Sequence, residues 1–208
     1  MTRVAVVVLA AGGSRRMGSP KQLLRIEGST LVRRAAETAL ASRCQGVYVV
    51  VGAAAESVRR EVLDLPLEVV ENRDWERGMA GSIRAGIGAV EAARPEFDAA
   101  ILAPVDQPRI HPALLDRLIE VFEGGEHGIV ASAYAGTVGA PALFARRYFG
   151  ELTALRGDRG AQPVLLARGA EVARIAFPEG STDLNTPEDY QQFLDADSRD
   201  AGRPPDPR

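Results

Sequence analysis

The run VAVVVLA at residues 4–10 constrains the fold of this chain more than any other segment. It is short, rich in β-branched residues and apolar at every position, so both of its faces have to be covered by other parts of the protein. A strand in the middle of a sheet, with helices on each side, meets that requirement. The run passes directly into a loop rich in glycine and arginine, AAGGSRRMGSPKQLL, at residues 10–24.

Strand and helix patterns alternate along the rest of the chain. Apolar β-branched runs predict further strands at 46–52, 67–70, 99–104, 129–133 and 172–175. Helical spacing predicts helices at 30–41, 56–63, 80–93, 112–122, around 162–168, and from Thr186 onward. After residue 133 the pattern is less regular, and we expect a glycine-rich connection through Gly136 and Gly139, followed by the stretch PALFARRYF. This alternation predicts a three-layer α/β/α, Rossmann-like sandwich with a mostly parallel mixed sheet.

Domain organisation follows from where the apolar residues stop. We see no internal repeat and no linker, which favours one domain over residues 1–194. From Asp195 to the last residue, 208, apolar side chains give way to Pro, Asp and Arg, and we expect a disordered tail there.

Composition narrows the partners and the compartment. A net charge of −3 argues against broad nucleic-acid binding and leaves room for a local basic cleft that takes a small anion. Cys44 is the only cysteine, so an intrachain disulfide and a cysteine metal cluster are excluded, and a cytoplasmic location is expected. No segment has the roughly 18 apolar residues of a membrane span, and the first apolar run is too short and ends in glycines and arginines, unlike a signal peptide.

One basic residue differs from all the others. Of the 25 lysines and arginines, only Lys21 is a lysine, and it ends the glycine loop. An ammonium is a compact point charge on a flexible stem, whereas a guanidinium is a broad planar fork. A lysine at this position is therefore suited to a narrow slot between phosphate oxygens and glycine backbone, with Arg15 and Arg16 adding charge nearby.

Two common phosphate-binding motifs do not match this loop. A P-loop requires Lys directly after its second glycine, but Ser19 and Pro20 separate Gly18 from Lys21. A dinucleotide fingerprint requires G-x-G-x-x-G, but Gly12 and Gly13 are adjacent. The loop instead resembles the signature of the MobA-like nucleotidyltransferases, L-A-[AG]-G-x-S-x-R-M-G-x-x-K, which LAAGGSRRMGSPK fills at every position from Leu9 to Lys21.

The resemblance implies a fold of the nucleotide-diphospho-sugar transferase type and a set of site residues. Its LAAG form is more similar to the molybdenum cofactor cytidylyltransferases than to the guanylyltransferases, which usually carry LAGG. The residues 72–87 resemble the segment whose Gly-Met-x-x-Ser turn faces the nucleobase. The implied nucleotide-binding residues are Leu9, Ala10, Ala11, Gly12, Gly13, Ser14, Arg15, Arg16, Lys21, Gly81 and Ser82, and the implied catalytic ones are Lys21, Arg16 and Asp106.

Three further segments complete the resemblance. LAPVDQP at 102–108 and DLNTPEDY at 183–190 are similar to segments that contact magnesium, which implies Mg²⁺ as the cofactor, held by Asp106 and Asp183. GDRGAQ at 157–162 is similar to a stretch near the acceptor, although Gln162 stands where an arginine is usual, which puts the acceptor in question. The implied acceptor pocket is Gly139, Pro141, Gly157, Asp158, Gln162 and Asn185.

The position of Asp106 in the sequence supports a metal site independently of the family resemblance. Asp106 follows an apolar strand and precedes Gln107 and Pro108, so its carboxylate would meet a ligand at the end of the sheet, where it could bind a hard cation. The alternatives are a plain cap or turn for Asp106 and Asp183, and a helix N-cap for Ser82. No nucleophile is paired with a base, so a covalent intermediate is not expected.

The expected function is transfer of a nucleoside monophosphate, CMP from CTP, to a phosphate-bearing acceptor such as molybdopterin, with release of pyrophosphate. Three alternatives remain open. The acceptor could be a sugar phosphate or a polyol phosphate such as methylerythritol phosphate. The chain could be an NAD(P)H-dependent reductase, because nicotine-blue-type oxidoreductases resemble these transferases. It could also be a non-catalytic nucleotide-binding protein that delivers cofactor to a molybdenum hydroxylase partner.

Overall fold

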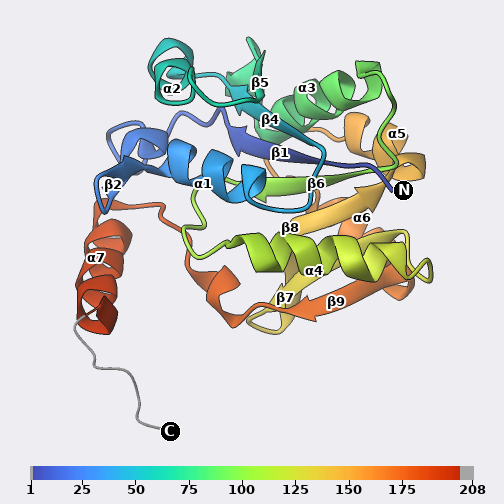
Figure 1. Ribbon diagram of the computed structural model, residues 1–208. Coiled ribbons are helices and arrows are strands. Elements are labelled where there is room, and N and C mark those ends of the chain that lie inside the picture. Colours follow the sequence, from blue (N-terminus) through green and yellow to red (C-terminus); the bar gives the residue numbers. More distant parts are fainter. Residues whose placement is uncertain (1, 202–208) are drawn as a thin grey trace, which may run out of the picture.

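The computed structural model describes residues 2–201, with side chains through residue 198 (Figure 1). Its centre is a seven-stranded sheet in the order β5-β4-β1-β6-β8-β7-β9. β8 runs antiparallel to both of its neighbours, and the other pairs are parallel, so the sheet is mixed and mostly parallel, as predicted. In sequence order the strands are Val4–Ala10 (β1), Gly46–Val51 (β4), Glu68–Glu71 (β5), Ala99–Pro104 (β6), Ile129–Tyr134 (β7), Thr137–Ala145 (β8) and Val172–Ala176 (β9).

β1 occupies the interior of the sheet that its composition requires. It pairs in parallel with β4 on one side and β6 on the other. Val4, Val6 and Val8 pack into the hydrophobic cluster on one face, and Ala5 and Val7 pack into the cluster on the opposite face. All five are fully buried. The period-2 alternation of a strand thus places apolar side chains in two separate cores.

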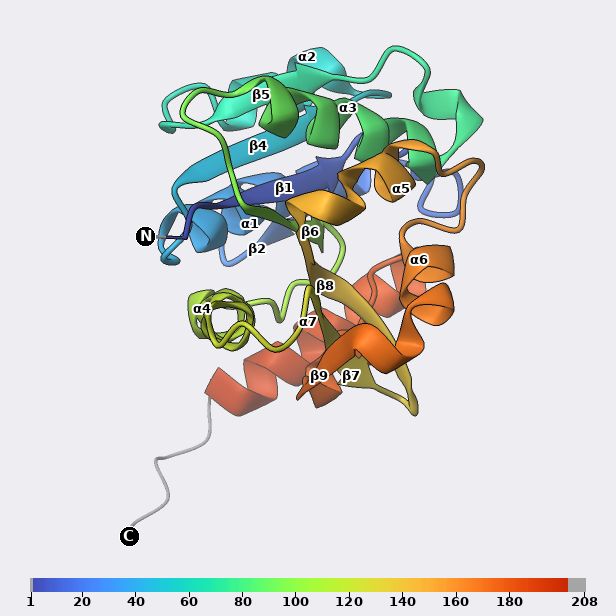
Figure 2. The same cartoon turned by 90° about the vertical axis from the view of Figure 1, so that its right-hand side faces the viewer.

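Helices cover both faces and make the predicted three layers (Figure 2). One face packs against Leu31–Leu40 (α1), Ala55–Glu61 (α2), Pro112–Glu123 (α4) and Pro187–Ala201 (α7). The other packs against Met79–Ala92 (α3), Phe149–Thr153 (α5) and Gln162–Ala167 (α6). A small hairpin of Arg25–Ile26 (β2) and Ser29–Thr30 (β3) precedes α1.

Side chains cap the starts of helices α1 and α4. Thr30 Oγ1 accepts from the N–H of Arg33 at the start of α1. His111 Nδ1 accepts from the N–H of Leu114 at the start of α4, directly before Pro112. These contacts satisfy N–H groups that have no partner within the first turn of a helix. The predicted helix starts near 30 and 112 are therefore confirmed.

The expectation of an irregular connection after residue 134 is wrong. A two-residue turn leads from β7 into β8, a nine-residue strand that the glycines and Pro141 conceal in the sequence. The ladder between β7 and β8 shifts register between Ala131 and Ser132, and the hydroxyl of Ser132 donates to the carbonyl of Pro141 over 2.8 Å. Pro141 is thus accommodated at an irregularity, the place where a strand inside a sheet tolerates proline.

The predicted start of the disordered tail at Asp195 is also wrong. Helix α7 continues to Ala201. Asp195 accepts from Gln191 over 2.9 Å, one turn earlier, and Asp197 pairs over 2.9 Å with Arg109, which lies in the loop between β6 and α4. These contacts extend the helix beyond its last buried apolar residue. The remainder of the predicted tail, 202–208, lies outside the described residues.

No helix within residues 2–201 is both long enough and apolar enough to cross a membrane.

Candidate active site

A cleft of about 380 Å³ opens where β1 and β6 end at their carboxyl edges. The loop after β1 forms one wall, the start of α3 forms another, and Asp106 and Asn185 lie at its base. Ligands of open parallel sheets bind at this edge, because the loops that follow neighbouring strands meet there. The predicted glycine loop and the predicted acidic residue after β6 are thus brought to one place.

The glycine loop is shaped by Gln22, a side chain that is only 1% exposed. Its amide nitrogen donates to the carbonyl of Ala10 over 2.9 Å and to the carbonyl of Gly12 over 2.7 Å. Both carbonyls are therefore satisfied and held in place by this amide. In the described part of the chain, the five consecutive N–H groups of residues 12–16 donate to no acceptor. Such a row of free N–H groups is an anion-binding concavity.

Two contacts fix the rest of the loop. Ser14 adopts a left-handed backbone conformation, with φ of +50°, and its hydroxyl accepts from the N–H of Lys21 over 2.9 Å. Gly13 lies against the indole of Trp75, and a Cβ at this position would be 2.6 Å from the ring. The unusual conformation and the close approach both bend the chain back so that Lys21 faces the cleft.

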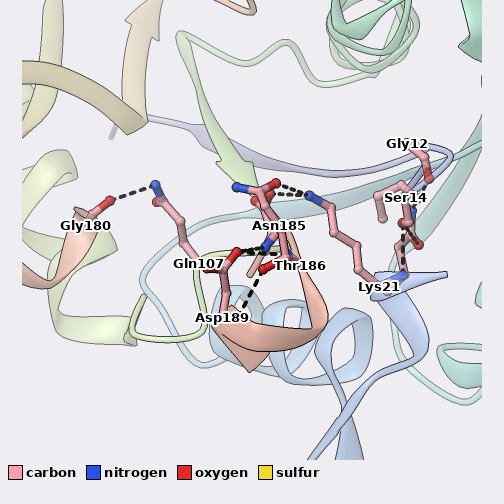
Figure 3. Close-up of polar contacts among 11 residues, drawn as sticks. Gly12, Ser14, Lys21, Gln107, Gly180, Asn185, Thr186 and Asp189 are labelled. Atoms are coloured by element: carbon pink, nitrogen blue, oxygen red, sulfur yellow. Dashed lines mark hydrogen bonds and ion pairs between the residues drawn. The ribbon is translucent and has the colours of Figure 1, made fainter. Parts of the chain in front are cut away.

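Lys21 is surrounded by oxygen atoms from distant parts of the chain (Figure 3). Its ammonium pairs with the carboxylate of Asp106 and donates to Oδ1 of Asn185 over 3.2 Å. The Lys21 and Asp106 side chains are 16% and 18% exposed. The N–H of Leu184 donates to the carbonyl of Asp106 over 2.9 Å and ties the two segments together. A positive charge is thus held between oxygens after β6 and before α7.

Asp183 and Asp189 surround this cluster. Burial raises the pKa of Asp183 above its ordinary value, and the nearby Asp106 carboxylate adds to the rise. The Asp189 carboxylate accepts from the N–H groups of Asn185 and Thr186, and the N–H of Asp189 donates to the Thr186 hydroxyl over 3.2 Å, which places Asp189 at the start of α7. The Thr186 side chain and these N–H groups lower the pKa of Asp189, and the charge of Arg16 acts in the same direction.

The donor set fits a hard divalent cation. The Lys21 ammonium already occupies a position between a carboxylate and an amide oxygen, which are ligands that Mg²⁺ and Mn²⁺ accept. Within the described residues, no group of three His, Cys, Asp or Glu side chains is arranged to hold a metal ion. An ion at Asp106 and Asp183 would therefore keep most of its positions for water and ligand phosphate, which is typical of Mg²⁺ sites.

Another side of the cleft is formed by Trp75 and the start of α3. Trp75, Met79 and Ser82 line it, together with the acidic residues Glu76 and Asp158. Gly78, with φ of +103°, directly precedes α3, and the N–H of Ala80 donates to the carbonyl of Gly157 over 3.0 Å, which brings the 157–160 turn against this helix. The cleft thus has a cationic loop and, beside it, a side with an aromatic ring, a thioether and a single hydroxyl.

The structure brings together most of the predicted site residues. Those that line the cleft are Leu9, Ala11, Gly12, Gly13, Arg15, Arg16, Lys21, Ser82, Asp106, Asp158 and Asn185. Ala10, Ser14 and Gly81 support its walls through the contacts with Gln22, Lys21 and Asn72. Asp183 is next to Asp106 and Lys21 but does not line the cleft.

The predicted acceptor residues are more scattered. Gly139 and Pro141 lie on β8, where Gly139 packs against the ring of Tyr134. Gln162 begins α6 and is exposed. Neither these three residues nor Gly157 line the described cleft, so their assignment to an acceptor pocket stays a prediction.

Sequence reasoning missed two residues that organise the site. Gln22 directly follows the signature lysine and looks like an ordinary polar residue in the sequence. Its position directly after Pro20 and Lys21 is the pattern that could have drawn attention to it. Asn72 is 6% exposed, directly follows β5 and donates to Ser82 over 3.1 Å. An asparagine directly after an apolar strand is the pattern that could have drawn attention to it.

The fold and the cleft define a class of α/β proteins that bind nucleotide phosphates on a loop after the first strand. Residues 6–172 match the model of the MobA-like NTP transferase domain. The chain belongs to this family, which confirms the resemblance drawn from the loop.

Relatives cover nearly the whole chain. It is 32% identical over 203 residues to nicotine blue oxidoreductase of Paenarthrobacter nicotinovorans, covering 92% of this chain and 96% of that protein. It is 30% identical over 198 residues to the purine catabolism protein PucB of Bacillus subtilis, with coverages of 88% and 92%. The crystal structure of Rv0371c from Mycobacterium tuberculosis superposes with a TM-score of 0.80 at 32% identity, over 93% of this chain and 98% of that one. Rv0371c has also been crystallised as a manganese complex.

Proposed function

We propose that this protein is a Mg²⁺-dependent nucleotidyltransferase that moves CMP from CTP to a phosphate-bearing acceptor, molybdopterin, and releases pyrophosphate. The observation that carries the proposal is the loop at the end of β1. Five free N–H groups and the side chains of Arg15, Arg16 and Lys21 gather in the loop that lines the cleft. This loop suits a triphosphate, and the neighbouring side with Trp75 and Met79 suits a planar base.

The residues support a reaction that depends on positioning and charge. An acceptor phosphate is already ionised at neutral pH and needs no general base, so the protein has to align it with the α-phosphorus of the nucleotide. The loop N–H groups and Arg16 hold the triphosphate, and Lys21 moves from Asp106 to the phosphate oxygens, where its charge offsets the charge that develops as pyrophosphate leaves. Asp106 and Asp183 would hold Mg²⁺, which would neutralise further phosphate charge when bound.

The manganese complex of Rv0371c supports a divalent metal for this family, and the proposal extends that to Mg²⁺ here. The family membership supports an NTP as the donor. The LAAG form of the loop is what favours cytidylyl transfer. Molybdopterin, a sugar phosphate and a polyol phosphate are the candidate acceptors, and Gln162 removes one cation from the region where the acceptor is expected.

A second candidate is an NAD(P)H-dependent reductase, which the identity to nicotine blue oxidoreductase favours. Hydride transfer does not require a cation site, whereas the oxygens of Asp106 and Asn185 around the Lys21 ammonium are suited to one. This cluster therefore favours the transferase. A non-catalytic delivery protein for a molybdenum hydroxylase would need the cleft only for binding.

Label transfer separates these functions. With CTP carrying ³²P in the α-phosphate, the transferase passes the label to the acceptor, and with ³²P in the γ-phosphate the label leaves in pyrophosphate. A delivery protein retains both labels in unchanged CTP. A reductase leaves CTP unchanged and oxidises NAD(P)H in the presence of a quinonoid dye. Either of the last two results would overturn the proposal.

A further inference from the structure

We infer that Asn72 fixes the hydroxyl of Ser82 as a hydrogen-bond donor toward the ligand, so that the cleft selects a base with an acceptor at that point. Within the described residues, neither side chain hydrogen-bonds to the loop that holds the phosphates. The inference rests on the proposed function, because it assigns the bound molecule a base. It makes Asn72 a positioning residue for base recognition.

The orientation of the Asn72 amide is set by its other contact. Its Oδ1 accepts from the N–H of Asp74 over 3.1 Å. A backbone N–H is always a donor, so the amide oxygen has to face it and the amide nitrogen has to face the other way. That nitrogen donates to Ser82 Oγ over 3.1 Å. The direction of the bond between the two side chains is thereby fixed.

The fixed direction determines where the hydroxyl hydrogen of Ser82 can go. Since Ser82 Oγ accepts from Asn72, its own hydrogen has to point to a different partner. Ser82 is 6% exposed, and within the described residues its hydroxyl donates to no acceptor. Because Ser82 lines the cleft, this hydrogen is available to a ligand that supplies an acceptor.

The surroundings indicate which part of the ligand this is. Ser82 lines the cleft together with Trp75 and Met79, and Met79 is 43% exposed although it is apolar. A planar base can lie against these two side chains and present a carbonyl oxygen or a ring nitrogen to the hydroxyl. Cytosine has both kinds of acceptor, at O2 and N3. The hydroxyl donates to the base edge, and the phosphates stay with Lys21 and the arginines.

Equilibrium binding of two probes tests this assignment. CTP has phosphates and a base, whereas inorganic tripolyphosphate has only the phosphates. Both dissociation constants are measured by calorimetry with Mg²⁺, without acceptor and at alkaline pH. Asn72→Asp leaves the shape nearly unchanged but replaces the donating amide by a carboxylate, which accepts the Ser82 hydrogen and turns it away from the ligand. Ser82→Ala removes the hydroxyl.

We expect Asn72→Asp and Ser82→Ala each to weaken CTP binding by roughly fivefold to tenfold, the range for one lost hydrogen bond. Tripolyphosphate binding stays as in the wild type. The double variant is no weaker than Ser82→Ala alone, because Asn72 acts through Ser82. Ser132→Ala is the matched control: it removes another buried serine hydroxyl, on β7, which does not line the cleft, and it changes neither constant.

Two results would overturn the inference. One is CTP binding in Ser82→Ala equal to that in the wild type. The other is an equal loss for CTP and tripolyphosphate in both variants, which indicates a general disturbance of the cleft. Failure of the proposed function has a different signature, namely wild-type protein that binds CTP no more tightly than tripolyphosphate.

Discussion

Replacing Gln22 by Met tests whether this side chain determines the shape of the phosphate loop, through two effects: one on the stability of the fold and one on phosphate binding. Met has nearly the volume of Gln but cannot donate, so the carbonyls of Ala10 and Gly12 both lose their partner. An unsatisfied buried polar group costs about 1–3 kcal/mol. Because the Gly12 carbonyl is only partly buried, we expect a total loss of about 2–4 kcal/mol in the free energy of unfolding. For a chain of this size that lowers Tm by roughly 5–15 °C.

The same change should affect phosphate binding directly. Without the Gln22 clamp the two carbonyls can turn toward the cleft, where they repel phosphate oxygens, and the row of free N–H groups is lost. We expect tripolyphosphate to bind about tenfold more weakly, the factor that corresponds to one charge-assisted hydrogen bond. Calorimetry measures the dissociation constant of tripolyphosphate. The temperature is chosen so that circular dichroism shows the variant to be folded.

Gln45→Met is the control for the Gln22 variant. Gln45 accepts from the N–H of Val4 over 2.7 Å at the other end of β1, so its replacement also removes a contact between a glutamine and this strand. We expect a small loss of stability and unchanged tripolyphosphate binding. If Gln22→Met bound tripolyphosphate as tightly as the wild type, the account of the loop would be refuted.

Three further predictions concern single contacts. Lys21→Met should bind Mn²⁺ more tightly than the wild type in the absence of nucleotide, because the ammonium no longer competes for the acidic site. Water-proton relaxation measures the binding of Mn²⁺, and unchanged or weaker binding in the variant would argue against a cation site there. Gly13→Ala should displace the indole of Trp75, the only tryptophan, and shift its fluorescence emission, whereas an unshifted spectrum would contradict the contact. Arg33 lowers the pKa of Asp64 to about 2, so the stabilising contribution of this pair is present above pH 4 and is lost as the pH falls toward 2. The difference in unfolding midpoint between the wild type and Asp64→Asn should therefore disappear over that interval.

The central part of the fold could be predicted because it depends on local patterns. β1 is apolar at every position, and only an interior strand buries both faces. Asp106 directly follows another buried strand, so its place at the carboxyl edge of the sheet follows from the parallel arrangement. The signature loop directly follows β1, so it lies at the same carboxyl edge for the same reason.

The remainder depended on contacts between distant segments. β8 is paired on both sides and buried, but Gly139 and Pro141 break the strand pattern in the sequence. The extension of α7 beyond Asp195 depends partly on Arg109, 88 positions before its partner Asp197. No local pattern predicts such pairs.

The candidate site shows the same division. The sequence indicated Lys21, Asp106 and Asn185 separately, and the structure joins them although Lys21 and Asn185 are 164 positions apart. The sequence did not indicate the side-chain orientation of Gln22, because a glutamine whose amide binds two carbonyls inside the protein cannot be distinguished in the sequence from an exposed glutamine.

The most direct test of the account is pyrophosphate release from CTP, GTP, ATP and UTP with Mg²⁺, with and without molybdopterin, by the wild type and by Asp106→Ala. The account predicts release from CTP that requires molybdopterin and is lost in Asp106→Ala, since the cation site is then incomplete. No release from any nucleotide, together with tight binding of NAD(P)H, would contradict it and would leave Lys21 as a clamp for the phosphate of a redox cofactor.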